Sequence, residues 1–374
     1  MKILHLGDFH LDSAFSGFEK DVADQKREEL RNCFVKALEI GRERGVELVL
    51  MAGDVFDTPF CTAATRRVVF NAIATAGCPV IIAPGNHDYY VKNGTYTDKA
   101  LPENAFVFTS AELGRFDFDE LGVSVIGYAF TSDRYEKNPL GTEIPLSDTN
   151  INILCAHGNL FSQFHKYAPL NAQEIADAGF VYAALGHVHI APEPQRIGNT
   201  LIAYSGFPQG RSFDELGEGG AYIVDIDRES GRAELERIKL STLSYEIERM
   251  DITSLDNDED VIRKIETVVA QKGYGENTAL RVVLSGSVPS SYSVGKVRIE
   301  TAPSLSHLAL LQIKNNSSAD FDLEYLENDM TVRGEIYRQL LPQLNSADER
   351  ERIRASLALK FALAALDKRE IGVD

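Results

Sequence analysis

Residues 78–90, CPVIIAPGNHDYY, place an apolar run directly before three polar side chains. The run at 80–83 is typical of a strand buried in a sheet, and Asn86, His87 and Asp88 follow within a few residues. Polar side chains at the end of a buried strand are costly to desolvate unless something binds them. The stretch therefore predicts either a capped loop or a functional site at a strand end.

Similar apolar runs recur along the first 204 residues, as expected for strands buried on both faces. They are KILHL (2–6), ELVLMA (47–52), PVIIA (79–83), VSVIG (123–127), INILCA (151–156), YAALG (182–186) and TLIAY (200–204). Apolar residues at helical spacing predict helices over 20–44 and 62–76, between the first three runs. This alternation indicates an α/β layered fold, and the closer runs beyond residue 115 suggest a second sheet packed on the first.

The composition changes after AYIVDID at 221–227. Here we expect a strand at 243–252, a helix at 258–273, a strand at 278–287 and helices at 331–342 and 346–368. We therefore divide the chain into a main domain at 1–242, a smaller α/β domain at 243–330 and C-terminal helices at 331–374. The last helix is apolar on two sides, one with Ile353, Leu357 and Phe361 and the other with Leu359, Leu363 and Leu366. A helix of this kind is usually covered.

The net charge of −18 argues against a protein coated in positive charge for nucleic acid. It leaves open a local basic groove, or a phosphate substrate held through metal ions. No apolar run approaches the roughly 20 residues that a membrane span needs, and the N-terminus lacks a signal-peptide core, so we expect a cytoplasmic protein. The four cysteines show no paired spacing and are expected to be free thiols.

Polar residues follow most of the apolar runs. They are Asp8 and His10, Asp54 and Asp57, Asn86, His87 and Asp88, His157, and His187 and His189. Because ligand sites in α/β sheets form at the carboxyl ends of strands, these groups are expected to converge on one rim. Carboxylate, imidazole and amide ligands without sulfur suit manganese, iron or zinc. The number of candidates favours two metals, the usual arrangement for phosphoester hydrolysis.

The order GDFH, GDVFD, GNHD, HG and GHVH over residues 7–189 resembles the calcineurin-like metallophosphoesterase superfamily. The resemblance implies a four-layer α/β/β/α sandwich with a two-metal centre. It assigns one metal to Asp8, His10, Asp54 and His189, and the other to Asp54, Asn86, His157 and His187. It also implies a metal-activated hydroxide as nucleophile, with His87 as the acid that protonates the leaving oxygen and Asp88 as the residue that orients His87.

Several residues keep two interpretations. Asp57 either caps the following helix or belongs to the site, and Arg211 either touches phosphate or forms a surface ion pair. His5, His165 and His307 are expected to be structural histidines.

Within the superfamily, GDFHLDSAFSGF, GDVFDTP and the segment at 203–227 resemble the bacterial SbcD-like exonucleases of DNA repair. This resemblance implies manganese-dependent cleavage of DNA, with iron, zinc or magnesium as other candidate metals. It further implies a homodimer, a DNA-capping role for the region after 245, and an SbcC-type coiled-coil ATPase as partner. The last helix is a candidate for docking that ATPase.

Two departures from the pattern limit what the resemblance transfers. Asp57 stands where some relatives have histidine, and Phe207 replaces a small polar residue. Two other functions remain open. One is a phosphatase or phosphodiesterase acting on nucleotides or phosphoproteins. The other is a non-catalytic protein that tethers DNA ends, although an intact His87 argues against it.

Overall fold

The computed structural model describes residues 1–161, 166–289, 292–320 and 323–366. The chain divides into two compact units, Met1–Ser244 and Tyr245–Asp374. His165 and the expected helical residues 367–368 lie outside the described residues.

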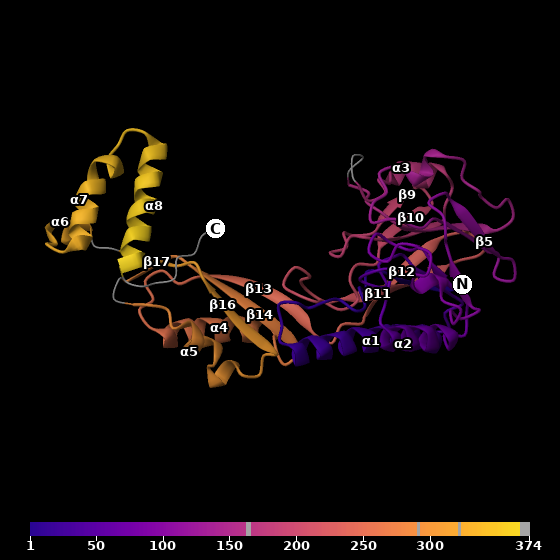
Figure 1. Cartoon of the computed structure of the whole chain (residues 1–374), viewed down its shortest axis with the longest axis horizontal. Helices are drawn as coiled ribbons and strands as arrows, with labels where there is room; N and C mark the ends of the chain where they lie inside the picture. The colour runs from indigo at the N-terminus through magenta and orange to yellow at the C-terminus, as the bar shows by residue number, and fades with distance from the viewer. Residues whose placement is uncertain (162–165, 290–291, 321–322, 367–374) are drawn as a thin grey trace. The chain divides into compact units, whose positions relative to one another are not determined.

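The first unit begins with a six-stranded sheet in the order β12-β11-β1-β2-β3-β4 (Figure 1). Strands β1 (Lys2–Leu6), β2 (Leu48–Met51), β3 (Val80–Ile82) and β4 (Ala105–Val107) run parallel. Strand β11 (Gly220–Ile226) pairs antiparallel with β1, and β12 (Ala233–Lys239) with β11. Helices α1 (Lys20–Glu43) and α2 (Ala63–Ala74) connect β1 to β2 and β2 to β3.

A second six-stranded sheet has the order β5-β6-β7-β8-β10-β9. Its parallel centre contains β6 (Val123–Gly127), β7 (Ile151–His157), β8 (Tyr182–Gly186) and β10 (Thr200–Tyr204). The antiparallel edges are β5 (Gly114–Phe118) and β9 (Gln195–Ile197). Helix α3 (Ala172–Asp177) precedes β8, and short 3-10 turns occur at Thr95–Thr97 and Pro139–Gly141.

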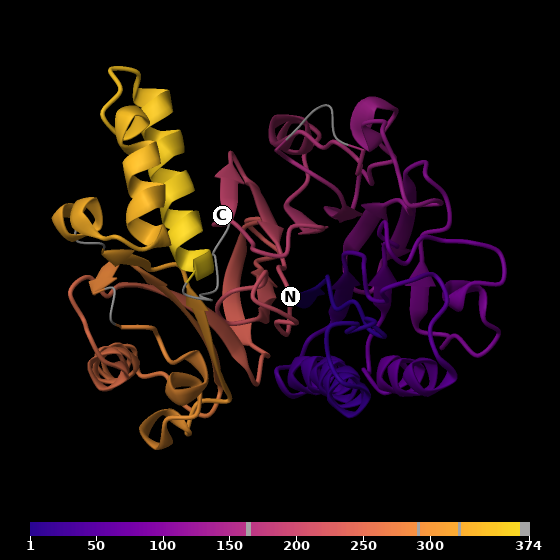
Figure 2. The same ribbon diagram turned by 60° about the vertical axis from the view of Figure 1, so that its left-hand side comes forward.

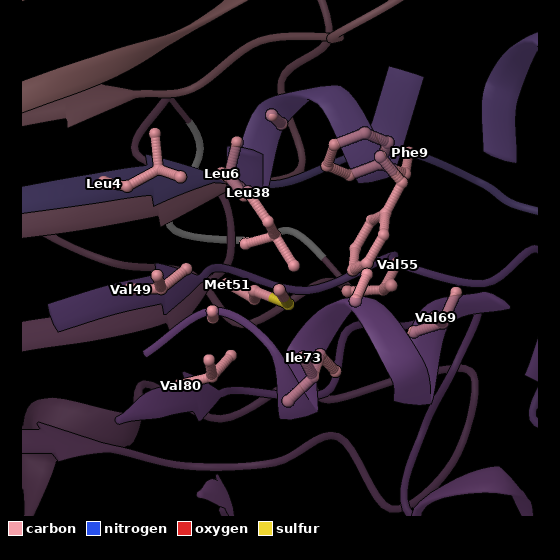
Figure 3. Close-up of a cluster of buried hydrophobic side chains, with 14 of the residues drawn as sticks. Leu4, Leu6, Phe9, Leu38, Val49, Met51, Val55, Val69, Ile73 and Val80 are labelled. Atoms are coloured by element: carbon pink, nitrogen blue, oxygen red, sulfur yellow. The ribbon is translucent and has the colours of Figure 1, made fainter. Parts of the chain in front are cut away.

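Side-chain alternation along the strands separates three buried layers. On one face of the first sheet, residues such as Leu4, Val49 and Met51 pack against α1 and α2 (Figure 3). On its other face, residues such as Leu50 pack against the second sheet. The outer face of the second sheet packs against α3 through Ile175. The predicted α/β/β/α sandwich is confirmed.

The seven apolar runs all form strands, and the two predicted helices match α1 and α2. The sequence did not indicate β4, β5, β9 and β12, which lie at the edges of the two sheets. These strands include exposed or half-buried positions, so their sequences lack a continuous apolar run.

The second unit contains a three-stranded sheet in the order β13-β14-β16 and a two-stranded sheet of β15 and β17. Its strands are β13 (Ser244–Asp251), β14 (Thr278–Ser285), β15 (Ser287–Pro289), β16 (Leu310–Asn315) and β17 (Ser318–Asp320). Its helices are α4 (Asp258–Lys272), α5 (Lys296–Glu300), α6 (Leu323–Asn328), α7 (Val332–Leu344) and α8 (Glu349–Leu366), with a 3-10 turn at Pro303–Leu305.

Helices α7 and α8 lie side by side as a hairpin in both views (Figures 1 and 2). Leu359 and Leu363 of α8 are buried in a small core with Leu326 and Tyr337. The opposite side of α8 is more open, since Ile353 and Leu357 are 55% and 46% exposed. The hairpin therefore covers one of the two apolar sides of α8. Among the described residues, no helix combines the length and apolarity that a membrane crossing requires.

Candidate metal centre

Loops at the carboxyl ends of both sheets meet at one place. Asp8, Asp54 and Asn86 follow β1, β2 and β3 of the first sheet, whereas His157 ends β7 and His187 follows β8 of the second. The sheets are joined here by the Asp8 carboxylate, which accepts a hydrogen bond from the backbone N–H of His187 at 3.0 Å. The expected convergence of the strand ends is thus present in the fold.

Four of the candidate ligands have left-handed backbones. The φ angles are 53° at Asp8, 47° at His10, 50° at Asp54 and 105° at His187. Such conformations are unfavourable for residues with a side chain and persist only where the surroundings enforce them. They turn each chain sharply as it leaves its strand, which directs the side chains into the centre.

Glycine at position 85 is required by close packing. A Cβ atom there would overlap the carboxylate of Asp54. The chain entering the GNHD segment can therefore pass against Asp54 only without a side chain at this position.

Three histidines are held in one tautomer by acceptors at Nδ1. The partners are Asp57 Oδ1 at 3.1 Å for His10, Glu215 Oε1 at 2.8 Å for His189, and the carbonyl oxygen of Ala52 at 2.9 Å for His157. Because each partner can only accept, each Nδ1 carries a hydrogen. The remaining nitrogen, Nε2, is the atom that each ring offers as a ligand.

The Nε2 atoms face one another and the buried carboxylates. His10 Nε2 lies 3.1 Å from His189 Nε2 and 3.6 Å from Asp54 Oδ2. His157 Nε2 lies 3.3 Å from the same Asp54 oxygen and 3.0 Å from Asn86 Oδ1. Asp54 therefore lies between the two sets of histidines, which is the position of a bridging ligand.

Three groups of potential ligand atoms have all their members within 4.8 Å of one another. They are Asp8, His10 and His189; Asp8, Asp54 and His157; and His10, Asp54 and His87. His187 belongs to none of these groups. Its ring instead packs against His157, at a centroid distance of 5.2 Å, and against Tyr167 at 4.9 Å.

Burial and mutual charge shift the pKa values of these groups. Burial raises the pKa of Asp8 to about 6. Burial also raises the pKa of Asp54, but the charge and hydrogen bond of His157, with the charge of His10, outweigh it and hold that pKa well below its usual range. Burial lowers the pKa of His157, yet Asp54 and Asp8 raise it to about 9. Buried carboxylates thus hold positive charge in this centre, and a cation could take the place of that charge.

His87 lies on the open side of the centre. Its side chain is 45% exposed, its ring packs edge-on against His10, and its backbone N–H donates to Asp54 Oδ1 at 2.9 Å. The ring Nδ1 lies 3.3 Å from the carbonyl oxygen of Asp57.

Asp88 has a different role from the one expected. Its buried carboxylate accepts hydrogen bonds from the backbone N–H groups of Gly85, Asp54, Val55 and Phe56 and from the Tyr96 hydroxyl. The His87 ring contacts Asp57 instead. Asp88 therefore ties the loop after β3 to the loop after β2, and the expectation that it orients His87 is corrected.

Asp57, Glu215 and Arg211 complete the surroundings. Helix α2 is capped by Thr62, whose side chain accepts from the N–H of Thr65, so Asp57 is not its cap and contacts His10. Glu215 went unnoticed in the sequence. The only signal for it was a spacing of four from Arg211, with which it forms a bidentate ion pair.

The α/β/β/α sandwich with carboxylates, imidazoles and an amide at its strand ends defines a metallophosphoesterase. Residues 1–191 match the family described as calcineurin-like phosphoesterase, and the chain belongs to this family. Members of the family depend on two divalent metals, and the ligand chemistry and fixed tautomers of this centre fit such a pair.

Three relatives are similar over most of their length. The uncharacterized metallophosphoesterase YhaO of Bacillus subtilis (strain 168) is 25% identical over 301 residues, which cover 77% of this chain and 72% of YhaO. The DNA double-strand break repair protein Mre11 of Thermoplasma acidophilum is 27% identical over 267 residues, with 65% and 66% covered. A component of the nuclease SbcCD of Bacillus subtilis (strain 168) is 24% identical over 304 residues, with 65% and 70% covered.

Proposed function

We propose that this metal-dependent phosphoesterase is a nuclease that hydrolyses phosphodiester bonds of DNA. The observation that carries the chemistry is the set of three histidines whose Nδ1 atoms are fixed by acceptors and whose Nε2 atoms face buried carboxylates. The choice of DNA rests on the relatives, two of which are named as a DNA double-strand break repair protein and as part of a nuclease.

Two groups of residues would hold the metals, for which we propose manganese. They are Asp8, His10, Asp54 and His189, and Asp54, Asn86, His157 and His187, with Asp54 shared. Such cations lower the pKa of bound water and withdraw charge from phosphoryl oxygens. The surrounding chain prepares the ligands by fixing their tautomers and excluding water from Asp54 and His157, which are 2% and 0% exposed.

His87 is proposed as the acid for the leaving oxygen. Its Nδ1 faces the Asp57 carbonyl oxygen, so its Nε2 is the nitrogen available to substrate. The hydrogen bond from its backbone to Asp54 fixes its distance from the centre, while its exposure gives access to a bound phosphodiester. Acid assistance of this kind typically contributes about 10²–10⁴-fold to the rate.

The test is digestion of end-labelled linear DNA with Mn²⁺, using the wild type and His87→Asn. We expect the wild type to degrade the DNA, chelation to stop it, and His87→Asn to be slower by about 10²–10⁴-fold with unchanged manganese affinity. His307→Asn, at an exposed position of the second unit, is the matched control.

Chromogenic diester and monoester substrates separate the alternatives. Preference for the monoester, without DNA cleavage, would replace the nuclease by a phosphatase acting on small phosphoesters or phosphoproteins. Absence of hydrolysis with every divalent metal tried would favour a protein that only tethers DNA ends.

We further propose that the exposed side of α8 docks an SbcC-type coiled-coil ATPase. Ile353 and Leu357 lie one turn apart on that side and are both about half exposed, so they can be altered without disturbing the hairpin core. Ile353→Glu with Leu357→Glu should abolish co-purification with the ATPase and preserve diester hydrolysis. Ala358→Glu introduces the same charge at another exposed position of α8 and should have no effect. Retained co-purification of the double variant would refute this docking site.

The second unit, Tyr245–Asp374, is proposed to provide the DNA-capping function, and the protein is proposed to act as a homodimer. Light scattering of the purified chain tests the dimer directly. A monomer at micromolar concentration would contradict it.

A further inference from the structure

We infer that Arg211, Glu215 and Asp57 form a positioning cluster that aligns His10 and His189 as a pair for one of the two cations. This inference rests on the proposed metal centre. It goes beyond it by assigning the metal affinity of one site to residues that contact only the ligands.

The first observation is that a carboxylate backs each of the two histidines. Asp57 Oδ1 lies 3.1 Å from His10 Nδ1, and Glu215 Oε1 lies 2.8 Å from His189 Nδ1. A carboxylate behind a metal-binding imidazole fixes the ring and raises the basicity of the other nitrogen. The two Nε2 atoms made available in this way are 3.1 Å apart.

The second observation is that Arg211 joins the two carboxylates. Its Nε and Nη2 donate to Glu215 at 3.0 and 2.5 Å, and its backbone N–H donates to the other Glu215 oxygen at 2.8 Å. Its Nη1 lies 3.8 Å from Asp57 Oδ1 and donates to Ser13 Oγ at 3.2 Å. One guanidinium therefore stands between the partner of His10 and the partner of His189.

These contacts decide between the two interpretations of Arg211. Its side chain is 19% exposed and that of Glu215 is 4% exposed, so the ion pair is largely screened from water. All three guanidinium nitrogens are engaged by groups of the protein. The geometry therefore favours a residue that holds the ligands over one that takes a substrate phosphate.

The other side of the centre is built differently. His157 is backed by the carbonyl oxygen of Ala52, a neutral backbone group, and its Nε2 faces the Asn86 amide. Weakening the cluster should therefore lower the affinity for the cation at His10 and His189 and leave the cation at His157 in place. Because Arg211 links both carboxylates, loss of one should weaken the contribution of the other.

The experiment measures Mn²⁺ binding by isothermal titration calorimetry, with the electron paramagnetic resonance spectrum of the bound Mn²⁺ as a second readout. The variants are Glu215→Gln, Asp57→Asn and their combination in the full chain. Each amide keeps an oxygen acceptor and removes the charge. The control is Glu218→Gln, which alters an exposed glutamate paired with Lys239 on the same loop.

We expect each single variant to bind one Mn²⁺ with wild-type affinity and the other about 10–100-fold more weakly. The spectrum should then change at equal metal from that of an interacting pair to that of a single ion. The double variant should lose less than the product of the two single losses. Glu218→Gln should match the wild type.

Two equal, wild-type affinities in both single variants would overturn the inference. Independent, multiplicative losses would overturn the linking role of Arg211. Should Glu215→Gln fail to fold, Asp57→Asn still decides, because Asp57 is partly exposed at 25%. A wild type that binds no Mn²⁺ would instead refute the proposed metal centre itself.

Discussion

Replacing Asp88 with asparagine tests the bond network beneath the centre. One oxygen of the buried carboxylate accepts from Gly85 at 2.7 Å and Asp54 at 3.1 Å, and the other accepts three further hydrogen bonds. An asparagine has one acceptor oxygen, so in either orientation its NH₂ group faces at least two donors. Each buried donor left unpaired costs about 1–3 kcal/mol. We therefore expect the first unit to lose about 3–5 kcal/mol of unfolding free energy.

The chain has no tryptophan, so calorimetry in the presence of a chelator is the suitable assay. Amide exchange of residues 54–56 and 85 should accelerate in the variant, which localises the effect. Tyr96→Phe is the matched control, since it removes one donor and keeps the carboxylate, and it should cost about 1 kcal/mol. The reasoning fails if Asp88→Asn unfolds within about 1 kcal/mol of the wild type. A loss of hydrolysis alone, with normal stability, would restore a direct role of Asp88 toward His87.

Three further predictions concern pH and packing. Burial lowers the pKa of His5 to about 3, so below pH 6.5 the unfolded chain binds a proton that the folded chain excludes. The unfolding free energy should fall by about 1.4 kcal/mol per pH unit from 6.5 towards 3, and urea titrations of His5→Gln should show a shallower slope. The His157 pKa is lowered by burial but raised to about 9 by its carboxylates. Manganese binding must therefore release its proton, and calorimetric affinity should increase with pH up to about 9, whereas a pH-independent affinity would contradict this. Gly85→Ala should cost about 1–3 kcal/mol and weaken manganese binding, because its Cβ meets Asp54, while Gly141→Ala, in open space, should be neutral.

Fold class was predictable because its signals are local. Continuous apolar runs mark the buried strands, and three- and four-residue spacing marks α1 and α2. The order of polar residues after those runs also identified Asp8, Asp54 and His157 as neighbours, since parallel strands bring their carboxyl ends to one edge.

The partners of these residues were not predictable in the same way. The chain has 56 acidic residues, and nothing in their spacing indicates that Glu215 lies beside His189 or Asp57 beside His10. Those pairings depend on loops whose sharp turns lack a sequence signature. Adjacency misled at Asp88, because consecutive side chains in an extended segment point to opposite sides. There the carboxylate points inward to Val55 and His87 points outward.

The left-handed backbones of Asp8, His10, Asp54 and His187 have a practical consequence. Glycine adopts such angles without penalty, so exchanging one of these side chains for glycine relieves conformational tension while removing chemistry. Inactive versions of this enzyme are therefore expected to be sturdier than the active one. They would be the better choice for trapping an uncleaved substrate on an intact scaffold.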